Sequence, residues 1–392
     1  MALALEGFRV LDLAQGISGP TCAMQLGDLG AVVIKIEPMT GDWLREIGPF
    51  HQPGGESELF LQLNRNKRGI ALDLKTDAGK EILARLVAAA DIIIEGYRPG
   101  VMQRLGFDYE TLQAKHPRLI YCSITGNGTS GPLADAPVTE IDTQARTGLN
   151  RHLSGPDKPP VRFGLDLASM GAAMAAFHGV MTALLWRERT GEGQHVETSL
   201  LAAQVSLLQW DLNADQARQR RVYTDLPDEG FATADGPVLV QMRGLDGWHR
   251  LLKALGREDL VQDERFASAP INAPTLAAAL KPQLAAMPYE DVRTLVEDQL
   301  SGTIVRMNDF KSLLYEPQVA AVGNIVEVEG HKTAGSYKTL DVPWGFIDEP
   351  LSALRLPAPV LGQHTAEVLR ELGYDDAAIS RLASDNVIRL AG

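Results

Sequence analysis

The sequence predicts an α/β protein in which helices cover both faces of a parallel sheet and a second, smaller domain follows. The first observation is a strand–helix–strand unit near the start, with strands at 8–14 and 31–37 around a short helix. The second is that apolar strands at 91–97 and 119–126 alternate with helical segments, which is typical of parallel sheets. The third is the length of 392 residues, which exceeds what one compact core usually holds.

The clearest helix lies between the second and third of these strands. The segment 77–90 places four apolar side chains on one face and an aspartate, a good capping residue, at its start. These residues are Asp77, Ile82, Leu83, Leu86 and Val87.

The pattern changes after residue 200. The chain is expected to be helical to 222, to form a strand at 235–242 and then to form short amphipathic helices over 246–315. A Pro-rich extended segment and a final helix follow at 355–374. We therefore predict a large domain at 1–222, a small α+β domain at 223–332 and a return to the large domain at 333–392.

Composition excludes several classes of function. The 37 basic and 50 acidic residues give a net charge of −13, which argues against nucleic acid as a partner. Cys22 and Cys122 are too few for a disulfide framework or a four-ligand zinc site. The start, MALALEGFRV, has no basic stretch and its apolar run ends at Glu6. We therefore expect no signal peptide, no membrane span and a cytoplasmic protein.

Basic residues gather near two of the predicted strands. Arg65, Lys67 and Arg68 lie in the segment 64–74, before a strand, and Arg98 and Arg104 follow another strand. In an acidic protein, two such clusters favour a polyphosphate ligand, because a guanidinium grips phosphate through parallel hydrogen bonds. A solvated turn is the alternative interpretation of the first cluster.

The segment QGISGP, directly after the first strand, is a candidate phosphate-binding turn at the start of a helix. Gly16 and Gly19 do not have the spacing of the dinucleotide-binding motif, and Pro20 has no amide hydrogen to donate. The glycine-rich loop TGNGTSGP follows another strand and can approach a ligand closely. His178 and His195 have no metal-ligand partners at suitable spacing, so no metal site is predicted.

Seven segments, in order along the chain, carry a resemblance to a known family. They are LEGFRVLDLAQGISGP, LGDLGAVVIKIEP, LNRNKRGIALDLKT, GYRPGVMQRLGF, PRLIYCSITGNGTSGP, ALLWRERTGEGQHVETSLL and LGQHTAEVLRELGY. Together they resemble the class III CoA-transferases, also called the CaiB/BaiF or formyl-CoA transferase family.

The resemblance implies a Rossmann-like large domain and two chains threaded through each other as an interlocked dimer, homomeric or heteromeric. It implies coenzyme A or an acyl-CoA as ligand and a carboxylic acid as second substrate. Carried over residue by residue, the family's CoA contacts fall on Gly16, Ile17, Ser18, Gly96, Tyr97, Arg98, Arg104 and Leu105.

The family's reaction uses one aspartate, and the sequence leaves its position open between Asp166 and Ser169. Counting from ALLWRERTGEGQ or from VRFG puts Ser169 in the family's position, with Asp166 three residues earlier. The chemistry needs a carboxylate, because the nucleophile must become a carbonyl that carries CoA. Asp166 can reach the site if the helix starts early, and otherwise it caps that helix. The family's upstream acid and glutamine fall on Glu140 and Gln144.

Other functions stay open at this stage. The chain can be a catalytically silent, CoA-binding subunit of a heteromeric transferase whose partner supplies the aspartate. An α-methylacyl-CoA racemase is a remote alternative, because Thr139 stands where the family's racemases have one histidine of a proton-transfer pair. A dinucleotide-dependent enzyme without CoA is a further remote alternative.

Overall fold

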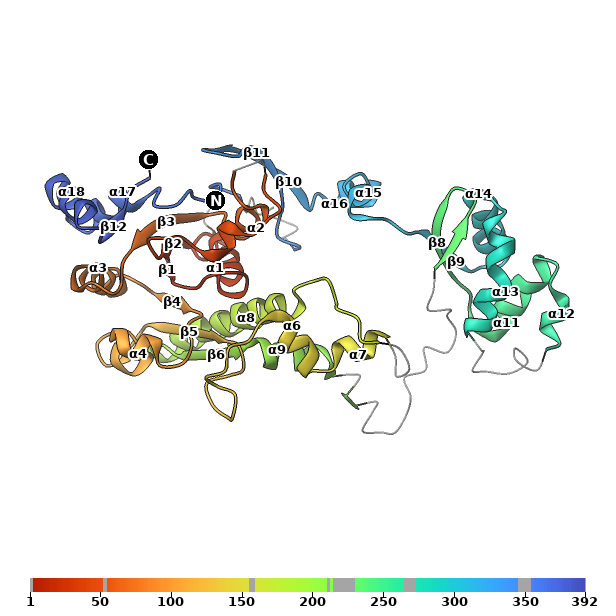
Figure 1. The fold of residues 1–392 in the computed structure, drawn as a ribbon, viewed down its shortest axis with the longest axis horizontal. Helices are drawn as coiled ribbons and strands as arrows, with labels where there is room; N and C mark the ends of the chain where they lie inside the picture. The colour runs from red at the N-terminus through yellow and green to blue at the C-terminus, as the bar shows by residue number, and fades with distance from the viewer. Residues whose placement is uncertain are drawn as a thin grey trace. The chain divides into compact units, whose positions relative to one another are not determined.

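The computed structural model describes residues 3–51, 55–154, 159–209, 212–213, 230–263, 273–344 and 354–391. The chain divides into two compact units, each of which is described by itself (Figure 1). Met1–Gln209 and Val322–Gly392 form the first unit, and Trp210–Ala321 forms the second. The sequence-based domain boundaries at 223 and 332 stay predictions.

The first unit is built on a sheet that holds seven strands of the described residues, in the order β12-β3-β2-β1-β4-β5-β6. Strands β1 to β6 run parallel, and β12 pairs antiparallel with β3. This confirms the predicted mixed α/β class with a large parallel sheet. The strands are β1 (Arg9–Asp12), β2 (Val32–Glu37), β3 (Lys67–Leu72), β4 (Ile92–Glu95), β5 (Ile120–Thr125), β6 (His195–Ser199) and β12 (Ile388–Arg389).

Each face of the sheet has its own apolar core, because successive side chains of a strand point to opposite faces. Val10 and Ile92 belong to one core, whereas Leu11 and Ile93 belong to the other. The first core is covered by α1 (Ser18–Asp28) and α8 (Leu167–Thr190), and the second by α3 (Asp77–Ala88), α17 (Thr365–Glu371) and α18 (Asp376–Ser384). Figure 1 shows this arrangement of helices around the strands.

Helix α3 is the helix predicted at 77–90, and its start differs in one detail. The hydroxyl of Thr76, rather than the carboxylate of Asp77, accepts the capping hydrogen bond, from the N–H of Gly79. Threonine at this position satisfies an otherwise unpaired N–H of the first turn.

Helix α8 packs closely on the sheet because its inner side is made of small residues, among them Ala172, Ala173 and Ala176. Among the described residues it is the one helix long and apolar enough to cross a membrane, with a mean hydropathy of 1.4 over 18 residues. Within that window 44% of the residues are buried inside the protein. A core helix meets the same criteria, so this composition is weak evidence for a membrane segment.

The remaining elements of the first unit are short and connect the strands. They are η1 (Trp43–Glu46), α2 (Glu58–Leu63), α4 (Val101–Leu105), α5 (Tyr109–Gln113), α6 (Glu140–Arg146), α7 (Leu149–Ser154), α9 (Leu200–Leu207), β10 (Ile325–His331) and β11 (Gly335–Leu340). Helix α9 begins where the helical stretch 200–222 was predicted, and most of that stretch beyond 209 lies outside the described residues.

The second unit contains a small antiparallel sheet in the order β7-β8-β9 and helices that surround a buried Trp248. Strand β8 confirms the strand predicted at 235–242. The elements are β7 (Phe231–Thr233), β8 (Gly236–Gln241), β9 (Thr303–Arg306), α11 (Gly244–Ala254), α12 (Glu258–Val261), α13 (Ala273–Ala285), α14 (Tyr289–Arg293), the π-helix η2 (Thr294–Gln299), α15 (Phe310–Leu313) and α16 (Pro317–Val322), which ends at the unit boundary.

Candidate active site

A pocket of about 930 Å³ opens at the carboxyl ends of the parallel strands in the first unit. Its walls come from the segments that follow β1, β4 and β5, from η1, and from the starts of α6 and α8. The chain changes direction across the sheet at β1, since β2 lies on one side of it and β4 on the other. Open α/β sheets bind ligands at such a switch point. The pocket is therefore the candidate active site.

The turn after β1 forms one wall, and its shape depends on glycine. Gly16 has a φ of +77°, and a Cβ atom there would lie 2.3 Å from Cζ2 of Trp43. Ile17, Ser18 and Trp43 line the pocket, whereas Gly16 does not itself belong to the lining. The absence of a side chain at Gly16 thus allows the indole ring of Trp43 to pack directly against the turn.

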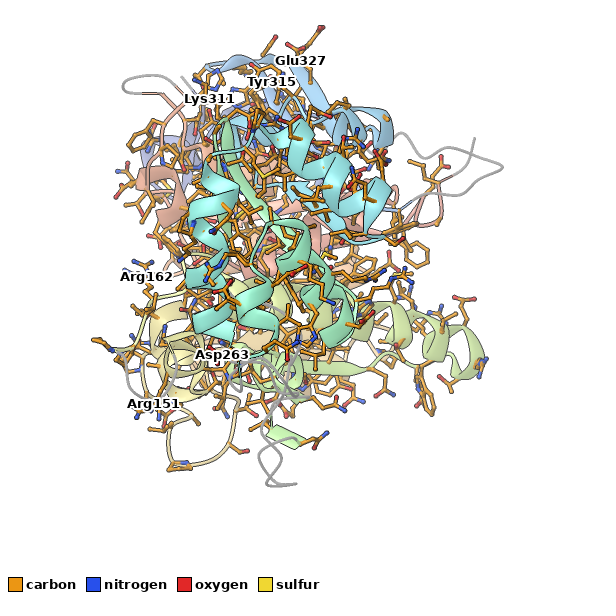
Figure 2. The ribbon with its side chains drawn as sticks, turned by 90° about the vertical axis from the view of Figure 1, so that its right-hand side faces the viewer. Arg151, Arg162, Asp263, Lys311, Tyr315 and Glu327 are labelled. Atoms are coloured by element: carbon orange, nitrogen blue, oxygen red, sulfur yellow. The ribbon has the colours of Figure 1, made fainter. Side chains whose placement is uncertain are left out.

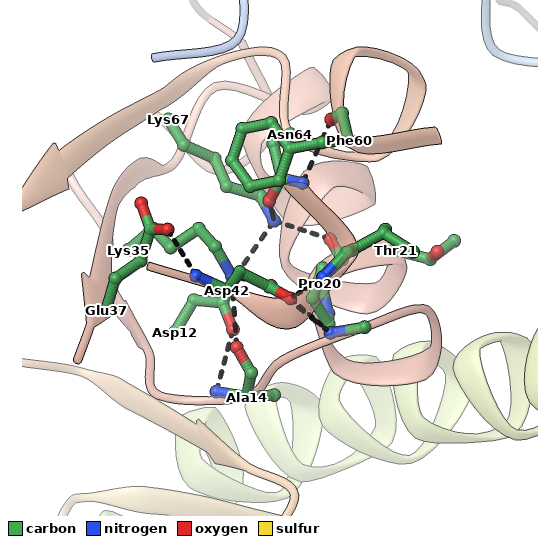
Figure 3. Close-up of polar contacts among 12 residues, drawn as sticks. Asp12, Ala14, Pro20, Thr21, Lys35, Glu37, Asp42, Phe60, Asn64 and Lys67 are labelled. Atoms are coloured by element: carbon green, nitrogen blue, oxygen red, sulfur yellow. Dashed lines mark hydrogen bonds and ion pairs between the residues drawn. The ribbon is translucent and has the colours of Figure 1, made fainter. Parts of the chain in front are cut away.

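A buried ion pair between Lys35 and Asp42 supports this turn on its interior side (Figure 3). Lys35 Nζ lies 2.9 Å from Asp42 Oδ2 and donates to the carbonyl oxygen of Ala14 at 3.0 Å. Asp42 Oδ1 accepts the N–H of Gly16 at 3.0 Å, and both charged side chains are fully buried. Burial by itself would lower the pKa of Lys35, but the carboxylates of Asp12, Asp42 and Glu37 outweigh it and raise that pKa.

Lys67 belongs to the same interior network and not to the pocket wall. Its ammonium group donates to Asp12 Oδ2 at 2.9 Å, to the carbonyl oxygen of Pro20 at 2.8 Å and to Asn64 Oδ1 at 2.8 Å (Figure 3). Burial is the main reason that the pKa of Lys67 falls to about 8, and repulsion by Lys35 adds to it. The lysine fastens the start of α1 to β3.

Arg65 and Arg68 are also engaged in internal ion pairs. Arg65 Nη2 lies 2.7 Å from Asp28 Oδ2, with both side chains buried, and Arg68 Nη2 lies 2.7 Å from Glu371 Oε1. Neither these arginines nor Lys67 line the pocket. The geometry of the cluster favours a structural role, rather than the predicted clamp on an anionic ligand.

The segment after β4 places part of the predicted CoA contacts on the pocket. Gly96, Tyr97 and Arg98 line it, and the N–H of Tyr97 donates to Glu95 Oε2 at 2.8 Å. Arg104 and Leu105 lie in α4, outside the lining. Arg98 is exposed and forms no ion pair within the described residues, so its guanidinium is free to meet a phosphate.

The start of α8 is capped by a carboxylate from another helix. Glu140 Oε1 accepts the N–H of Ala168 at 2.9 Å and Gln144 Nε2 at 3.1 Å. Glu140 Oε2 accepts both the N–H of Ser169, at 2.9 Å, and its hydroxyl, at 2.8 Å. The described residues therefore give Glu140 four donors, which stabilise its negative charge.

Asp166 occupies the N-cap position of α8, but its side chain makes no capping hydrogen bond. The carboxylate lines the pocket and has neither a hydrogen bond nor an ion pair within the described part of the chain. Burial is the main cause that raises its pKa, and the charge of Glu140 raises it further, while Arg162 acts in the opposite direction. Ser169 lines the same pocket one helical turn further on.

Two histidines singled out in the sequence lie away from this pocket. His195 Nε2 lies 3.0 Å from Ser123 Oγ, and its ring stacks on Tyr109 with the centroids 4.7 Å apart. Among the described residues, no group of three or more His, Cys, Asp or Glu side chains could hold a metal ion.

Sequence reasoning missed three residues that shape the pocket, which are Asp42, Trp43 and Arg162. Asp42 and Trp43 lie in the segment after the second strand, which ends at Glu37, and this segment is at the edge where loops of a parallel sheet gather. That position was an available signal. Arg162 stands inside the VRFG motif that served only to fix the register of Ser169.

Comparisons with known proteins find relatives that match nearly the whole chain. The human succinyl-CoA:glutarate CoA-transferase is 33% identical over 398 residues, which cover 98% of this chain and 90% of the relative. The formyl-CoA:oxalate CoA-transferase of Streptomyces avermitilis is 31% identical over 421 aligned residues, covering 99% of this chain and all of the relative.

Solved structures lead to the same family. A CaiB/BaiF family protein from Brucella suis superposes with a TM-score of 0.83 at 29% identity, covering 95% of this chain and 100% of that one. The Mycobacterium tuberculosis protein Rv3272 gives a TM-score of 0.80 at 29% identity, covering 94% and 99%. The CoA-transferase family III matches residues 5–365. These findings confirm the predicted family and enzyme class, and the chain belongs to the family III CoA-transferases.

Proposed function

We propose that the protein binds an acyl-CoA in this pocket and moves CoA to a carboxylic acid, with Asp166 as the nucleophile. The observation that carries the proposal is the unpaired Asp166 carboxylate on the pocket wall, beside a Glu140 that is held by four donors among the described residues. A carboxylate that has a raised pKa and no hydrogen bond from the described residues is the more reactive of the two. The relatives, whose names give glutarate and oxalate as acids, support a short carboxylic acid as acceptor.

The cycle that family membership implies needs only one carboxylate. The Asp166 carboxylate attacks the thioester carbonyl, which releases CoA thiolate and leaves a mixed anhydride. The thiolate then attacks the aspartyl carbonyl, so that the first acid leaves and an aspartyl-CoA thioester remains. The acceptor carboxylate takes CoA by the same steps in reverse, and the Asp166 carboxylate is regenerated.

The experiment that tests this proposal traps the intermediate. Incubation with acyl-CoA followed by hydroxylamine should convert the activated aspartate to a hydroxamate, which mass spectrometry then assigns to a peptide. A hydroxamate on Asp166 is the expected result. A hydroxamate on Glu140, or an acyl ester on Ser169, would move the chemistry to another residue.

A second candidate function is a CoA-binding subunit that is silent without a partner. In its favour, counting along the sequence puts Ser169 in the family's catalytic position, and Ser169 donates its hydroxyl to Glu140. Its test is Ser169→Asp, measured as exchange of label between acid and acyl-CoA. A chain that is inactive as wild type and gains exchange with Asp at 169 supports the silent subunit. A chain that is already active alone contradicts it.

Activity should depend on the ionisation of Asp166, which gives a prediction for the pH profile. The nucleophile must be ionised, and its pKa is raised, so exchange should fall on acidification at a higher pH than for an ordinary aspartate. Glu140→Gln removes a charge that raises this pKa and should move the acid limb to lower pH. The control is Asp142→Asn, because Asp142 is not among the charges that shift Asp166. An unmoved limb in Glu140→Gln would contradict the assignment.

We also propose the interlocked dimer and domain arrangement that the resemblance implies. Large exposed apolar side chains support an interface on each unit, with Leu185 and Trp186 on α8 and Phe310 and Tyr315 in the second unit (Tyr315 is labelled in Figure 2). Mass photometry at nanomolar concentration measures this. A dimer is expected, and a stable folded monomer would exclude an interlocked assembly.

A further inference from the structure

The pocket contains charges that its own residues do not neutralise. Among the described lining residues, the basic ones are Arg98 and Arg162, and the acidic ones are Glu140, Asp142 and Asp166. Glu140 is occupied by the start of α8, and Asp142 Oδ2 accepts the N–H and the hydroxyl of Thr139 at 2.9 and 2.7 Å. Neither acid therefore offers a partner to the two arginines.

The two arginines come from different segments of the pocket wall. Arg98 follows β4, in the segment whose neighbours Gly96 and Tyr97 are predicted CoA contacts. Arg162 precedes α8 by five residues and stands four residues before Asp166. An extended run of four residues spans at most about 14 Å, so the long side chain of Arg162 can reach a group bound next to Asp166.

Arg162 is also free to bind a substrate. Its side chain is exposed and extends from the ribbon in Figure 2, and it forms no ion pair or hydrogen bond within the described residues. Its positive charge counteracts the rise in the pKa of Asp166, the residue proposed as the nucleophile. A pocket guanidinium that has no hydrogen-bonded acid among the described residues favours a carboxylate or phosphate, which it binds through two parallel hydrogen bonds.

We propose that Arg162 binds the second carboxylate of a dicarboxylic substrate whose first carboxylate, or thioester carbonyl, is held at Asp166. The inference rests on the proposed function, because it needs Asp166 to mark the reacting end. Both halves of the cycle place an acyl group at the same aspartate. Arg162 therefore recognises the same chemical group in both substrates. One substrate is the dicarboxylic acid that accepts CoA, and the other is the CoA monothioester of a dicarboxylic acid, which donates it.

The test compares acids of equal length that differ only in the second carboxylate. The pairs are succinate with butyrate and glutarate with pentanoate, each measured as kcat/KM for CoA transfer in the full-length protein. The wild type should prefer the dicarboxylic acid. Arg162→Met should lower the ratio of dicarboxylic to monocarboxylic kcat/KM by about 10- to 100-fold, the range for a hydrogen-bonded charge. Arg162→Lys keeps the positive charge but cannot donate two parallel hydrogen bonds, so it should restore part of the ratio.

Arg98→Met is the matched control, since it removes the other pocket guanidinium that has no ion pair within the described residues. It should raise the KM for the CoA thioester with every acid and leave the ratio between acids unchanged. If Arg162→Met instead lowers transfer to both acids equally, or weakens binding of free CoA, Arg162 contacts CoA and the proposal is overturned.

A binding measurement separates this proposal from the proposed function. Calorimetry with succinyl-CoA and butyryl-CoA needs no turnover, and Arg162→Met should remove a preference for succinyl-CoA. A preference that depends on Arg162, in a protein that forms no adduct on Asp166, would keep the carboxylate site and reject the nucleophile. Equal affinity for the two thioesters in the wild type would reject the carboxylate site.

Discussion

Asp166→Asn is expected to lower the exchange of label between a carboxylic acid and its acyl-CoA by about 10⁴-fold or more, the scale of losing a covalent nucleophile. The amide has nearly the same shape as the carboxylate but cannot attack the thioester carbonyl. The fold should be unaffected, because the side chain of Asp166 makes no hydrogen bond or ion pair among the described residues. Exchange with radiolabelled acid, measured at equilibrium, reports the complete cycle.

Two measurements make the loss interpretable. CoA affinity by calorimetry should change little, since the predicted CoA contacts lie after β1 and β4 and not at the start of α8. Asp142→Asn alters another pocket carboxylate, one already held by Thr139, and should retain most of the exchange. Equal exchange rates in wild type and Asp166→Asn would leave Asp166 without a catalytic role.

The position of Asp166 illustrates what the sequence can and cannot predict about the site. Counting along the chain identifies Ser169 as the residue in register and Asp166 as the carboxylate, but gives no means of choosing between them. The structure starts α8 at Leu167, so that both side chains reach the same pocket one turn apart. It also shows that Glu140, from a helix 27 residues earlier in the chain, takes the capping position that Asp166 leaves unused. Such a long-range hydrogen bond has no local sequence signal.

The basic cluster at residues 65–68 shows why distant partners cannot be predicted. Three cations within four positions are compatible with a ligand clamp or with a solvated turn when only the sequence is known. Their partners are Asp28, Asp12 and Glu371, which are far away in the chain and are brought close only by the order of the strands. The parallel strands themselves were predictable, because buried strands of such a sheet are continuously apolar.

The second large effect is expected from the ion pair behind the turn that follows β1. Lys35→Met should destabilise the first unit by about 3–5 kcal/mol, because it leaves the buried carboxylate of Asp42 without its cation. It also removes the hydrogen bond to the carbonyl of Ala14, so the turn that carries Ile17 and Ser18 loses its support. Urea unfolding measures the first effect, and the Kd for acyl-CoA measures the second.

A double-mutant cycle separates the pair from its surroundings. Asp42→Asn keeps an oxygen for the N–H of Gly16, and in combination with Lys35→Met it leaves no unpaired charge at this position. The double variant should therefore be less destabilised than the sum of the two single variants, with a coupling of about 1–3 kcal/mol.

Arg68→Met is the control for the loss of an ion pair as such. Its partner Glu371 is 55% exposed, so this variant should lose at most about 1 kcal/mol of stability. Acyl-CoA affinity should fall in Lys35→Met and stay unchanged in Arg68→Met, since Lys35 contacts the turn on the pocket wall, whereas Arg68 pairs with Glu371 elsewhere. A Lys35→Met protein as stable as Arg68→Met, with wild-type affinity, would mean that the turn keeps its shape without the lysine.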